Sequence, residues 1–142
     1  METLTVRTQS HDQMVDITSQ VQEIVARSGV ESGEVVVFVP HTTAGITVNE
    51  HADPDVARDI LEVLDRLVPW RADYHHREGN AASHVKAGLM GSSAGLIIEG
   101  GRLVLGTWQG VFLCEFDGPR SRKVHVRLQP TPAVTDRAEP FP

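Results

Sequence analysis

Cysteine is nearly absent from this chain, which has a single one, Cys114, among 142 residues. An internal disulfide is therefore excluded, and 142 residues are enough for one domain with a core of its own. Cys114 ends the apolar run 111–114, which predicts a buried and unreactive thiol. Because the chain does not depend on disulfides, we expect a reducing, cytoplasmic location.

Long apolar segments are also missing. No stretch approaches the roughly 20 apolar residues of a membrane span, so we expect no membrane partner. Residues 1–4 lack the basic and then apolar regions of a signal peptide. A formal charge of -6 argues against nucleic acid as a partner. The chain has neither a Walker motif nor a nucleophile elbow.

What the chain does contain is a series of short apolar runs with the periodicity of strands. These strands are expected at 4–6, 15–17, 34–39, 44–48, 95–99, 102–107, 110–116 and 122–128. The strand at 44–48 is expected to lie beside the one at 34–39, and Gly100-Gly101 is a hairpin turn. We therefore predict a single compact α+β domain over 1–129, a mostly antiparallel sheet with two to three inserted helices. A proline-rich tail follows at 130–142.

Capping residues indicate where the helices begin. Ser19 and Gln22 have the form of a capping box, and Asp53-Pro54 is a strong helix start. Asn80 can cap a third helix. The inner apolar stripes of the second and third helices are predicted to consist of Val56, Ile60, Leu64 and Leu67, and of Ala81, Val85 and Leu89.

His41 is the first candidate for function. It lies between two predicted strands, where a turn of Gly, Asn or Asp is usual, and Thr42 follows it. An imidazole with neighbouring hydroxyls can bind a metal or an anion, or move a proton. A polar connection whose threonines bond their own backbone is the alternative.

Further histidines cluster around the predicted third helix. His76 and His84, together with His41, offer three ligands of the type that zinc or another transition metal takes, although no tight ligand spacing is present. Surface histidines in a polar loop are the alternative, above all for His75. Three others, His11, His51 and His125, are interpreted as structural or solvent-facing.

Cations for an anionic ligand are also available. Lys86 follows His84 by two residues, about 200° around an ideal helix, so both cannot easily face one small spot. Arg120 and Arg122 flank Ser121 in a turn that suits phosphate, or that is simply solvated. Ser92 adds a hydroxyl and backbone amides after the third helix.

Two polar groups lie near the ends of other strands. Glu50 precedes the Asp53 helix start, where it serves either function or a hydrogen bond to the backbone. Trp108 is expected in the core. Thr107 and Gln109 would then share the opposite face, where their polar groups need a partner or a ligand.

Several of these motifs occur together in a recognisable order. They are His41-Thr42-Thr43-Ala44, Val48-Asn49-Glu50, Asp53-Pro54, Tyr74-His75-His76, Ser83-His84-Val85-Lys86, Leu89-Met90-Gly91 and Gly106-Thr107-Trp108-Gln109-Gly110, followed by Glu115. In order and spacing they closely resemble the motifs of the YjbQ-like proteins, a family of secondary thiamine-phosphate synthases. The resemblance extends over about residues 4–128.

The resemblance implies a compact α+β fold, a homotrimer and a polar site near a subunit boundary. It also implies a weak synthase activity, in which hydroxymethylpyrimidine diphosphate joins thiazole phosphate and pyrophosphate is released. The matching positions of the polar site are His41, Thr42, Glu50, His76, His84, Lys86, Thr107 and Gln109.

We expect Glu50, Lys86 and His41 to take part in catalysis. A departing pyrophosphate needs positive charge, which a divalent ion with Lys86 and an arginine can supply. Magnesium prefers oxygen ligands, whereas three histidines suit zinc, so either the histidines donate directly to phosphate or the metal is not magnesium. Two alternatives remain: a non-catalytic trimer that binds a metal or a phosphorylated metabolite, and a metal-dependent phosphate-ester hydrolase.

Overall fold

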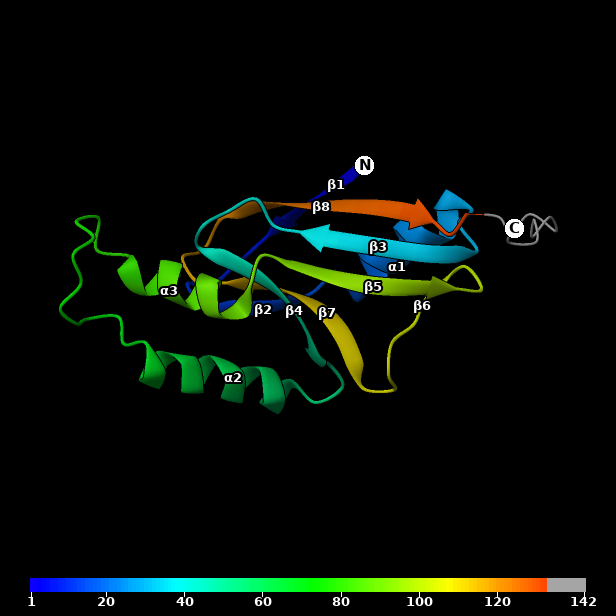
Figure 1. Ribbon diagram of the computed structural model, residues 1–142. Coiled ribbons are helices and arrows are strands. Elements are labelled where there is room, and N and C mark those ends of the chain that lie inside the picture. The colour runs from blue at the N-terminus through cyan, green and yellow to red at the C-terminus, as the bar shows by residue number, and fades with distance from the viewer. Residues whose placement is uncertain (133–142) are drawn as a thin grey trace, which may run out of the picture.

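The computed structural model describes residues 1–132, so most of the predicted proline-rich tail lies outside the described residues. The described chain forms two antiparallel sheets and three helices (Figure 1). In spatial order, the five-stranded sheet consists of β1 (Glu2–Arg7), β8 (Ser121–Pro130), β3 (Ser32–Phe38), β5 (Ser93–Glu99) and β6 (Arg102–Leu103). The three-stranded sheet consists of β2 (Gln13–Asp16), β7 (Gln109–Glu115) and β4 (Ala44–Glu50). The predicted α+β class is confirmed.

The core lies between these sheets and the first helix, α1 (Thr18–Ser28). Strand β3 shows how it forms, because Val35 and Val37 are fully buried while the alternate residues are exposed. Ile24 of α1 packs into the same cluster. A second, smaller cluster contains Cys114. As predicted, this thiol is buried, and burial raises its pKa to about 12.

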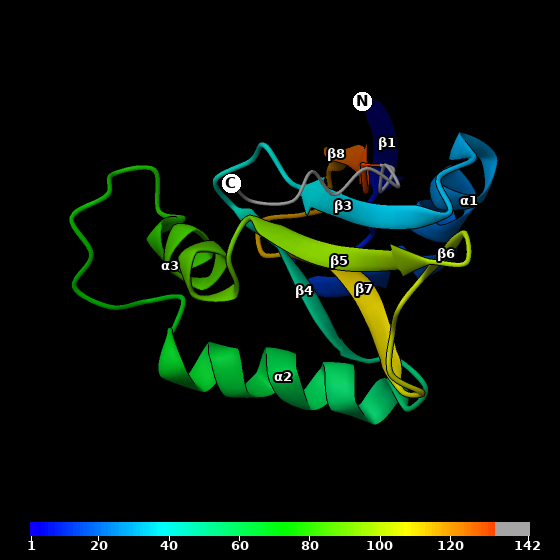
Figure 2. The same ribbon diagram turned by 45° about the vertical axis from the view of Figure 1, so that its right-hand side comes forward.

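The predicted pairing of the strand at 44–48 with the strand at 34–39 is wrong. β3 lies between β5 and β8, whereas β4 pairs with β7 in the other sheet. Figure 2 shows β4 and β7 running across the direction of β3 and β5. Residues 39–43 connect the two sheets, so this segment is a crossing between layers rather than a hairpin. His41 therefore lies at the junction of the two sheets.

The helix starts show which capping signals are used. Before α2 (Pro54–Leu67), the side chain of Asp53 accepts a hydrogen bond from Asp55 N at 2.9 Å, as predicted. The capping box at Ser19 does not form, because α1 already begins at Thr18. Instead Asp16 accepts a hydrogen bond from Thr18 N at 2.9 Å.

The third helix, α3 (Ala81–Met90), buries a different face from the one predicted. Val85 and Leu89 are exposed, whereas Ala82, Ser83 and Lys86 are buried. The apolar residues do not predict the buried face here, because the face of α3 toward β4 and Phe116 carries small and polar side chains. For example, Ser83 Oγ donates to Phe116 O at 2.6 Å. Asn80 precedes the helix but makes no capping bond with its side chain.

Two large apolar side chains that were expected inside are also exposed. Leu67, at the end of α2, is 70 % exposed, and Trp108 is 62 % exposed. The predicted hairpin at Gly100-Gly101 forms, but β6 beyond it has only two residues. At the C-terminal end β8 continues to Pro130, which pairs with Gly33.

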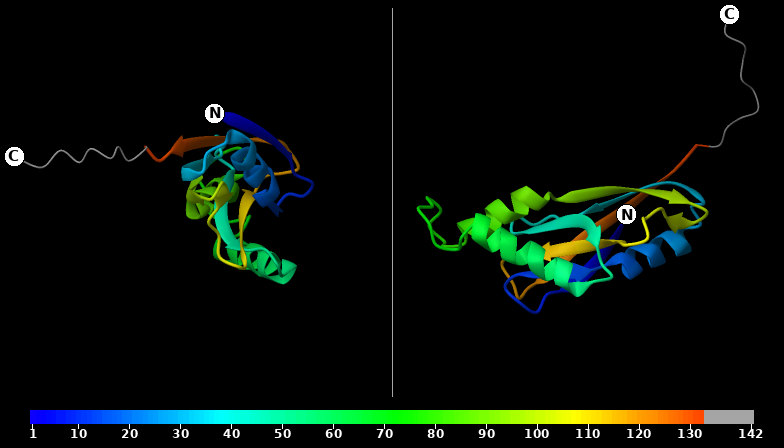
Figure 3. Two further views of the ribbon diagram at one scale, coloured as in Figure 1. Left: turned by 90° about the vertical axis from the view of Figure 1, so that its right-hand side faces the viewer. Right: turned by 90° about the horizontal axis from the view of Figure 1, so that it is seen from below.

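The helices frame the site described below. Figures 1 and 3 show α2 and α3 together at one end of the molecule and α1 at the other. None of the helices within residues 1–132 is long and apolar enough to cross a membrane.

Candidate functional site

A polar hollow opens beside His41, at the junction of the two sheets and the start of α3. Its volume is about 370 Å³. It is lined by Pro40, His41, Thr42, Thr43, Glu78, Asn80, His84, Asp117, Arg120 and Arg122. The structure thus brings together five of the predicted site residues from three separate segments of the chain. They are His41, Thr42, His84, Arg120 and Arg122.

The imidazole of His41 is held by the backbone of β8. Its Nε2 accepts a hydrogen bond from Lys123 N at 2.9 Å, so in the neutral ring the proton is on Nδ1. Burial, and then the positive charge of Arg122, lower the pKa of His41 below its usual value. His41 is therefore a neutral ring at pH 7 with one N–H left to donate.

Arg122 is the most deeply buried cation in the hollow, with 3 % of its surface exposed. Its Nε donates to Glu115 Oε1 at 2.9 Å, and its Nη2 donates to the carboxylate of Glu115 and to Thr43 Oγ1, the latter at 2.8 Å. Within residues 1–132, Nη1 of Arg122 has no hydrogen-bond partner. The guanidinium is thus fixed along one edge and has a free donor on the other.

Glu115 is the carboxylate that pairs with Arg122. It is completely buried, and Thr8 Oγ1 donates to its Oε1 at 2.7 Å. Burial alone would raise the pKa of Glu115, but the hydrogen bonds from Arg122 and Thr8 outweigh it and hold the pKa below its usual range. The pair is ionised at pH 7, and its geometry orients the guanidinium.

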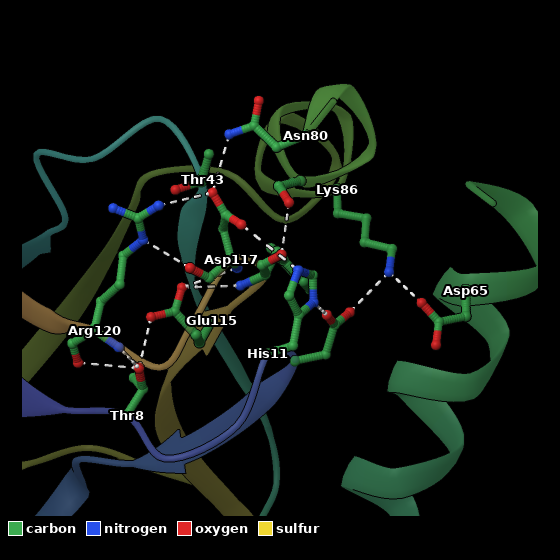
Figure 4. Close-up of polar contacts among 12 residues, drawn as sticks. Thr8, His11, Thr43, Asp65, Asn80, Lys86, Glu115, Asp117 and Arg120 are labelled. Atoms are coloured by element: carbon green, nitrogen blue, oxygen red, sulfur yellow. Dashed lines mark hydrogen bonds and ion pairs between the residues drawn. The ribbon is translucent and has the colours of Figure 1, made fainter. Parts of the chain in front are cut away.

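Asp117 neutralises the second arginine of the hollow. Nη2 of Arg120 donates to Asp117 Oδ2 at 3.1 Å, and Asn80 Nδ2 donates to the same oxygen at 3.0 Å (Figure 4). Asn80 Oδ1 is buried without a partner among residues 1–132. Arg120 is more than half exposed, so it contributes less fixed charge than Arg122.

His84 connects the polar hollow to two neighbouring ones. An apolar hollow of about 400 Å³ is lined by His41, Thr42, Ala44, His84, Ala87, Gly88, Gly91 and Ser92. A third hollow, also about 400 Å³, is lined by Asp73, Tyr74, His75, His76, Ala81, His84 and Val85. Ser92 therefore lies in the apolar hollow, and His76 lies in the third.

The three predicted metal-ligating histidines are not arranged as one ligand set. The ring centroids of His76 and His84 are 5.0 Å apart in an edge-to-face contact. Nε2 of His41 already accepts a bond from Lys123. Within the described residues, no three His, Cys, Asp or Glu side chains are grouped to hold a metal ion. The side chains of residues 1–132 therefore offer no fitting ligand set for zinc or magnesium within one chain.

Lys86 faces away from the polar hollow. It is 2 % exposed, and its Nζ donates to Asp12 Oδ2 at 2.7 Å and to Asp65 Oδ1. Figure 4 shows the side chain extending toward Asp65 of α2 and away from Arg120. Burial would lower the pKa of Lys86, but these two hydrogen bonds raise it above its usual value. Lys86 ties α3 to α2 and to the loop before β2, and it is not solvated.

The remaining predicted site residues lie at the far end of β4. Glu50 pairs with Gln109, whereas Ala44, beside Thr42, pairs with Glu115. Those seven strand residues span about 20 Å. Glu50 Oε2 accepts a hydrogen bond from Asp53 N at 2.9 Å, and Gln109 Oε1 accepts one from Gly106 N at 2.9 Å. Within one chain, Glu50, Thr107 and Gln109 are thus separate from the polar hollow.

Sequence reasoning missed Glu115 as the partner of Arg122, Asp12 as a partner of Lys86, and Asp16 as the partner of His51. Glu115 had a signal in the sequence, because it is the only charged residue in the apolar run 111–116. No feature of the sequence indicated the partners of Asp12 and Asp16. Asp16 Oδ2 lies 2.8 Å from Nδ1 of His51, whose ring lies over Gly110, where a Cβ would be 2.5 Å away. His51 therefore contacts Asp16 and Gly110, and its position in the sequence did not indicate these contacts.

Comparison with known proteins gives a consistent result. Residues 2–131 match the model of the family described as UPF0047 protein YjbQ-like. YugU of Bacillus subtilis is 46% identical over 129 residues, which cover 90% of this chain and 98% of YugU. The UPF0047 protein MJ1081 of Methanocaldococcus jannaschii is 46% identical over 123 residues, covering 87% and 89% of the two chains.

Solved structures show the same fold. A YjbQ/UPF0047 family protein of Clostridium acetobutylicum superposes with a TM-score of 0.89 at 56% identity, covering 91% of this chain and 100% of its own. A YjbQ-like protein of Sulfolobus solfataricus superposes with a TM-score of 0.88 at 35% identity, covering 92% and 96%. The chain described here is a member of the YjbQ-like UPF0047 family.

Proposed function

We propose that the polar hollow binds the phosphate or diphosphate group of a small metabolite. The observation that carries this proposal is Arg122, a buried cation that lines the hollow. Its guanidinium is fixed by Glu115 and Thr43, and its Nη1 has no hydrogen-bond partner within residues 1–132. Fixed guanidinium donors match phosphate oxygens in geometry and charge.

His41 and Thr42 complete the donor set. With Nε2 of His41 occupied by Lys123 N, its Nδ1–H is the group left for an anion, and this favours direct donation to phosphate over metal ligation. The Thr42 hydroxyl adds a neutral donor at the same hollow. Two carboxylates, Glu78 and Asp117, also line it, but Asp117 is engaged by Arg120 and Asn80.

The reaction we propose for this site is the weak thiamine-phosphate synthase transfer. The bond between the hydroxymethyl carbon and the diphosphate oxygen breaks, pyrophosphate leaves with the electron pair, and the thiazole nitrogen forms the new bond to that carbon. Arg122 and the His41 N–H would stabilise the charge on the departing pyrophosphate. Lys86, neutralised by Asp12 and Asp65, is a weaker candidate for this role than Arg122.

Because Asp12 and Asp65 neutralise Lys86, the site lacks the cation expected to assist departure of pyrophosphate. This favours a second candidate function, a non-catalytic protein that binds a phosphorylated metabolite. Steady-state turnover separates the two. A synthase with this reaction as its task should reach about 10⁴ M⁻¹s⁻¹ in kcat/KM with the pyrimidine diphosphate and thiazole phosphate. A value several orders of magnitude lower, with tight pyrophosphate binding, would favour the binding protein.

Calorimetric titration with pyrophosphate tests the binding site itself. Arg122→Lys keeps the charge but loses the fork of donors, so we expect pyrophosphate affinity to fall about tenfold or more. Arg127→Lys is the matched control, because Arg127 lies on the same strand outside the hollow. Equal affinity of Arg122→Lys and the parent, with both variants folded, would contradict the proposal.

A further inference from the structure

The loop between α2 and α3 forms part of the rim of the polar hollow. Its residues 71–79 are exposed except for Tyr74, which is partly buried. Within residues 1–132, the hydrogen bonds of this loop stay inside the segment 69–79, such as the bond from Tyr74 N to Ala72 O at 2.8 Å. Figures 1 and 2 show the loop projecting away from both sheets. A segment with so few bonds to the rest of the molecule moves at low cost.

The two ends of this loop, in contrast, are fixed. At one end the ring of Trp70 contacts the ring of His11 edge-to-face, with the centroids 4.7 Å apart. At the other end Asn80 Nδ2 donates to Asp117 Oδ2 at 3.0 Å. Gly79 precedes Asn80 with a φ of +80°, and a Cβ there would meet nothing within 4 Å. Glycine adopts such angles readily, so Gly79 can serve as a hinge for the loop.

The polar hollow has no surplus of positive charge. Arg122 is paired with Glu115, and Arg120 is paired with Asp117, so each guanidinium is neutralised by a carboxylate. Glu78 adds a further carboxylate from the loop. A diphosphate carries several negative charges and is bound where positive charge meets them. A further cation is therefore needed at the hollow when such a ligand binds.

Arg77 is in position to supply that charge, because it stands beside Glu78 in the turn directly before Gly79. It is exposed, and within residues 1–132 it forms neither an ion pair nor a hydrogen bond. We propose that residues 71–79 are a lid that turns at Gly79 when an anion enters the hollow. Arg77 then replaces Glu78 at the rim and binds the phosphate. This inference rests on the proposed phosphate site, and it adds to that site a binding residue and a closing movement.

Arg77→Gln tests the binding residue, and the exposure of Arg77 means that the change should leave the fold intact. Pyrophosphate is titrated calorimetrically against the full chain. We expect the affinity of Arg77→Gln to fall about tenfold, because a charge-assisted hydrogen bond is lost. Arg71→Gln is the matched control, since it removes the same charge from the end of the lid that does not line the hollow. Its affinity should stay within about twofold of the parent.

Trypsin cleavage measures the movement of the lid, because trypsin cuts after arginine. In the Arg71→Gln protein, Arg77 is the only arginine or lysine left in residues 71–79, so cleavage there is read directly. We expect saturating pyrophosphate to slow this cleavage about tenfold, since closing of the lid lowers the population of the exposed form. Cleavage of a free peptide of the same sequence should not change.

The outcomes separate the lid from the phosphate site. Parental affinity in Arg77→Gln would overturn the lid alone. Unchanged cleavage after Arg77 in protein saturated with pyrophosphate would do the same. A parent that binds no pyrophosphate would overturn the phosphate site, and the lid with it.

Discussion

At the scale of single residues, burial decides which charged groups are structural and which remain available. Lys86 and Arg122 are both almost fully buried, yet they differ in their free donors. Lys86 is shared between two carboxylates, Asp12 and Asp65. Within residues 1–132, Arg122 has one carboxylate partner, Glu115, and its Nη1 makes no hydrogen bond. The same kind of charge therefore stabilises the fold in one place, whereas in the other we propose that it binds an anion.

Replacing Lys86 by methionine should destabilise the protein by about 2 kcal/mol, since the change leaves the part-buried Asp12 without its cation. Urea unfolding measures this. The matched control is Lys123→Met at the chain's other lysine, whose Nζ donates to Thr5 at an exposed position; it should change stability by no more than about 0.5 kcal/mol. A Lys86→Met protein of parental stability with lost synthase turnover would instead support the catalytic role predicted from the sequence.

His41 should make stability depend on pH. Its pKa in the folded chain is lowered, first by burial, whereas in the unfolded chain it titrates near its ordinary value of about 6.5. Between those two values the unfolded state binds more protons, so the free energy of unfolding falls as the pH is lowered through that window. Below the folded pKa the loss levels off.

Urea unfolding at a series of pH values between about 7.5 and 5 measures this effect. His41→Gln removes the titrating group and should flatten the curve in that window. If His41→Gln and the parent have the same slope, the environment of His41 is not the one described here.

At the scale of helices and strands, local signals were reliable where one residue acts on its own neighbours. Asp53-Pro54 placed the start of α2 correctly, because a cap and a proline act within one turn. Local signals of this kind do not predict which face of α3 is buried. The partners of Lys86 are 74 and 21 residues away, so only the fold brings them together. The sequence did hold one clue, since Lys86 and His84 lie about 200° apart on a helix.

The same limit applies to strand pairing. The runs at 34–39 and 44–48 were recognised as strands, but their apolar residues do not reveal that residues 39–43 cross between two sheets. Pairing depends on partners far along the chain, such as β8 for β3 and β7 for β4. The hollow at this crossing therefore could not be predicted in shape, although His41, Thr42, His84 and both arginines were identified as candidates.

The two helix starts give a direct test at this scale. Asp53→Ala removes the bond to Asp55 N and should lower the free energy of unfolding by about 1 kcal/mol. Ser19→Ala is the matched control, since Ser19 is exposed and makes no capping bond, and its effect should stay within about 0.5 kcal/mol. Thermal or urea unfolding distinguishes them. A larger loss in Ser19→Ala than in Asp53→Ala would contradict the capping assignments.

At the scale of the whole molecule, large apolar side chains remain on the surface of the single chain. Trp108, Leu67, Leu89 and Ile97 are each more than half exposed. Exposed apolar side chains of this size often belong to subunit interfaces. We propose the homotrimer that the family resemblance implies, and we expect some of these side chains to be covered in it.

Light scattering at micromolar concentration should therefore give about three times the mass of one chain. Trp108→Ser should weaken the assembly if this side chain lies at the interface, and Trp70→Ser, at the less exposed tryptophan, provides a comparison. A monomer that stays monomeric across the accessible concentration range would contradict the trimer. It would leave the phosphate site, which is built within one chain, unaffected.

The central claim is that the polar hollow beside His41 binds phosphate through Arg122 and its neighbouring imidazoles. NMR of the histidine ring resonances during a pyrophosphate titration tests it most directly, because the chain contains its own reference. His41 and His84 line the hollow, whereas His51 follows Glu50 at the far end of β4. We predict that the signals of His41 and His84 shift together with one dissociation constant while that of His51 stays in place. Unchanged signals at His41 and His84, or an equal shift at His51, would contradict the account.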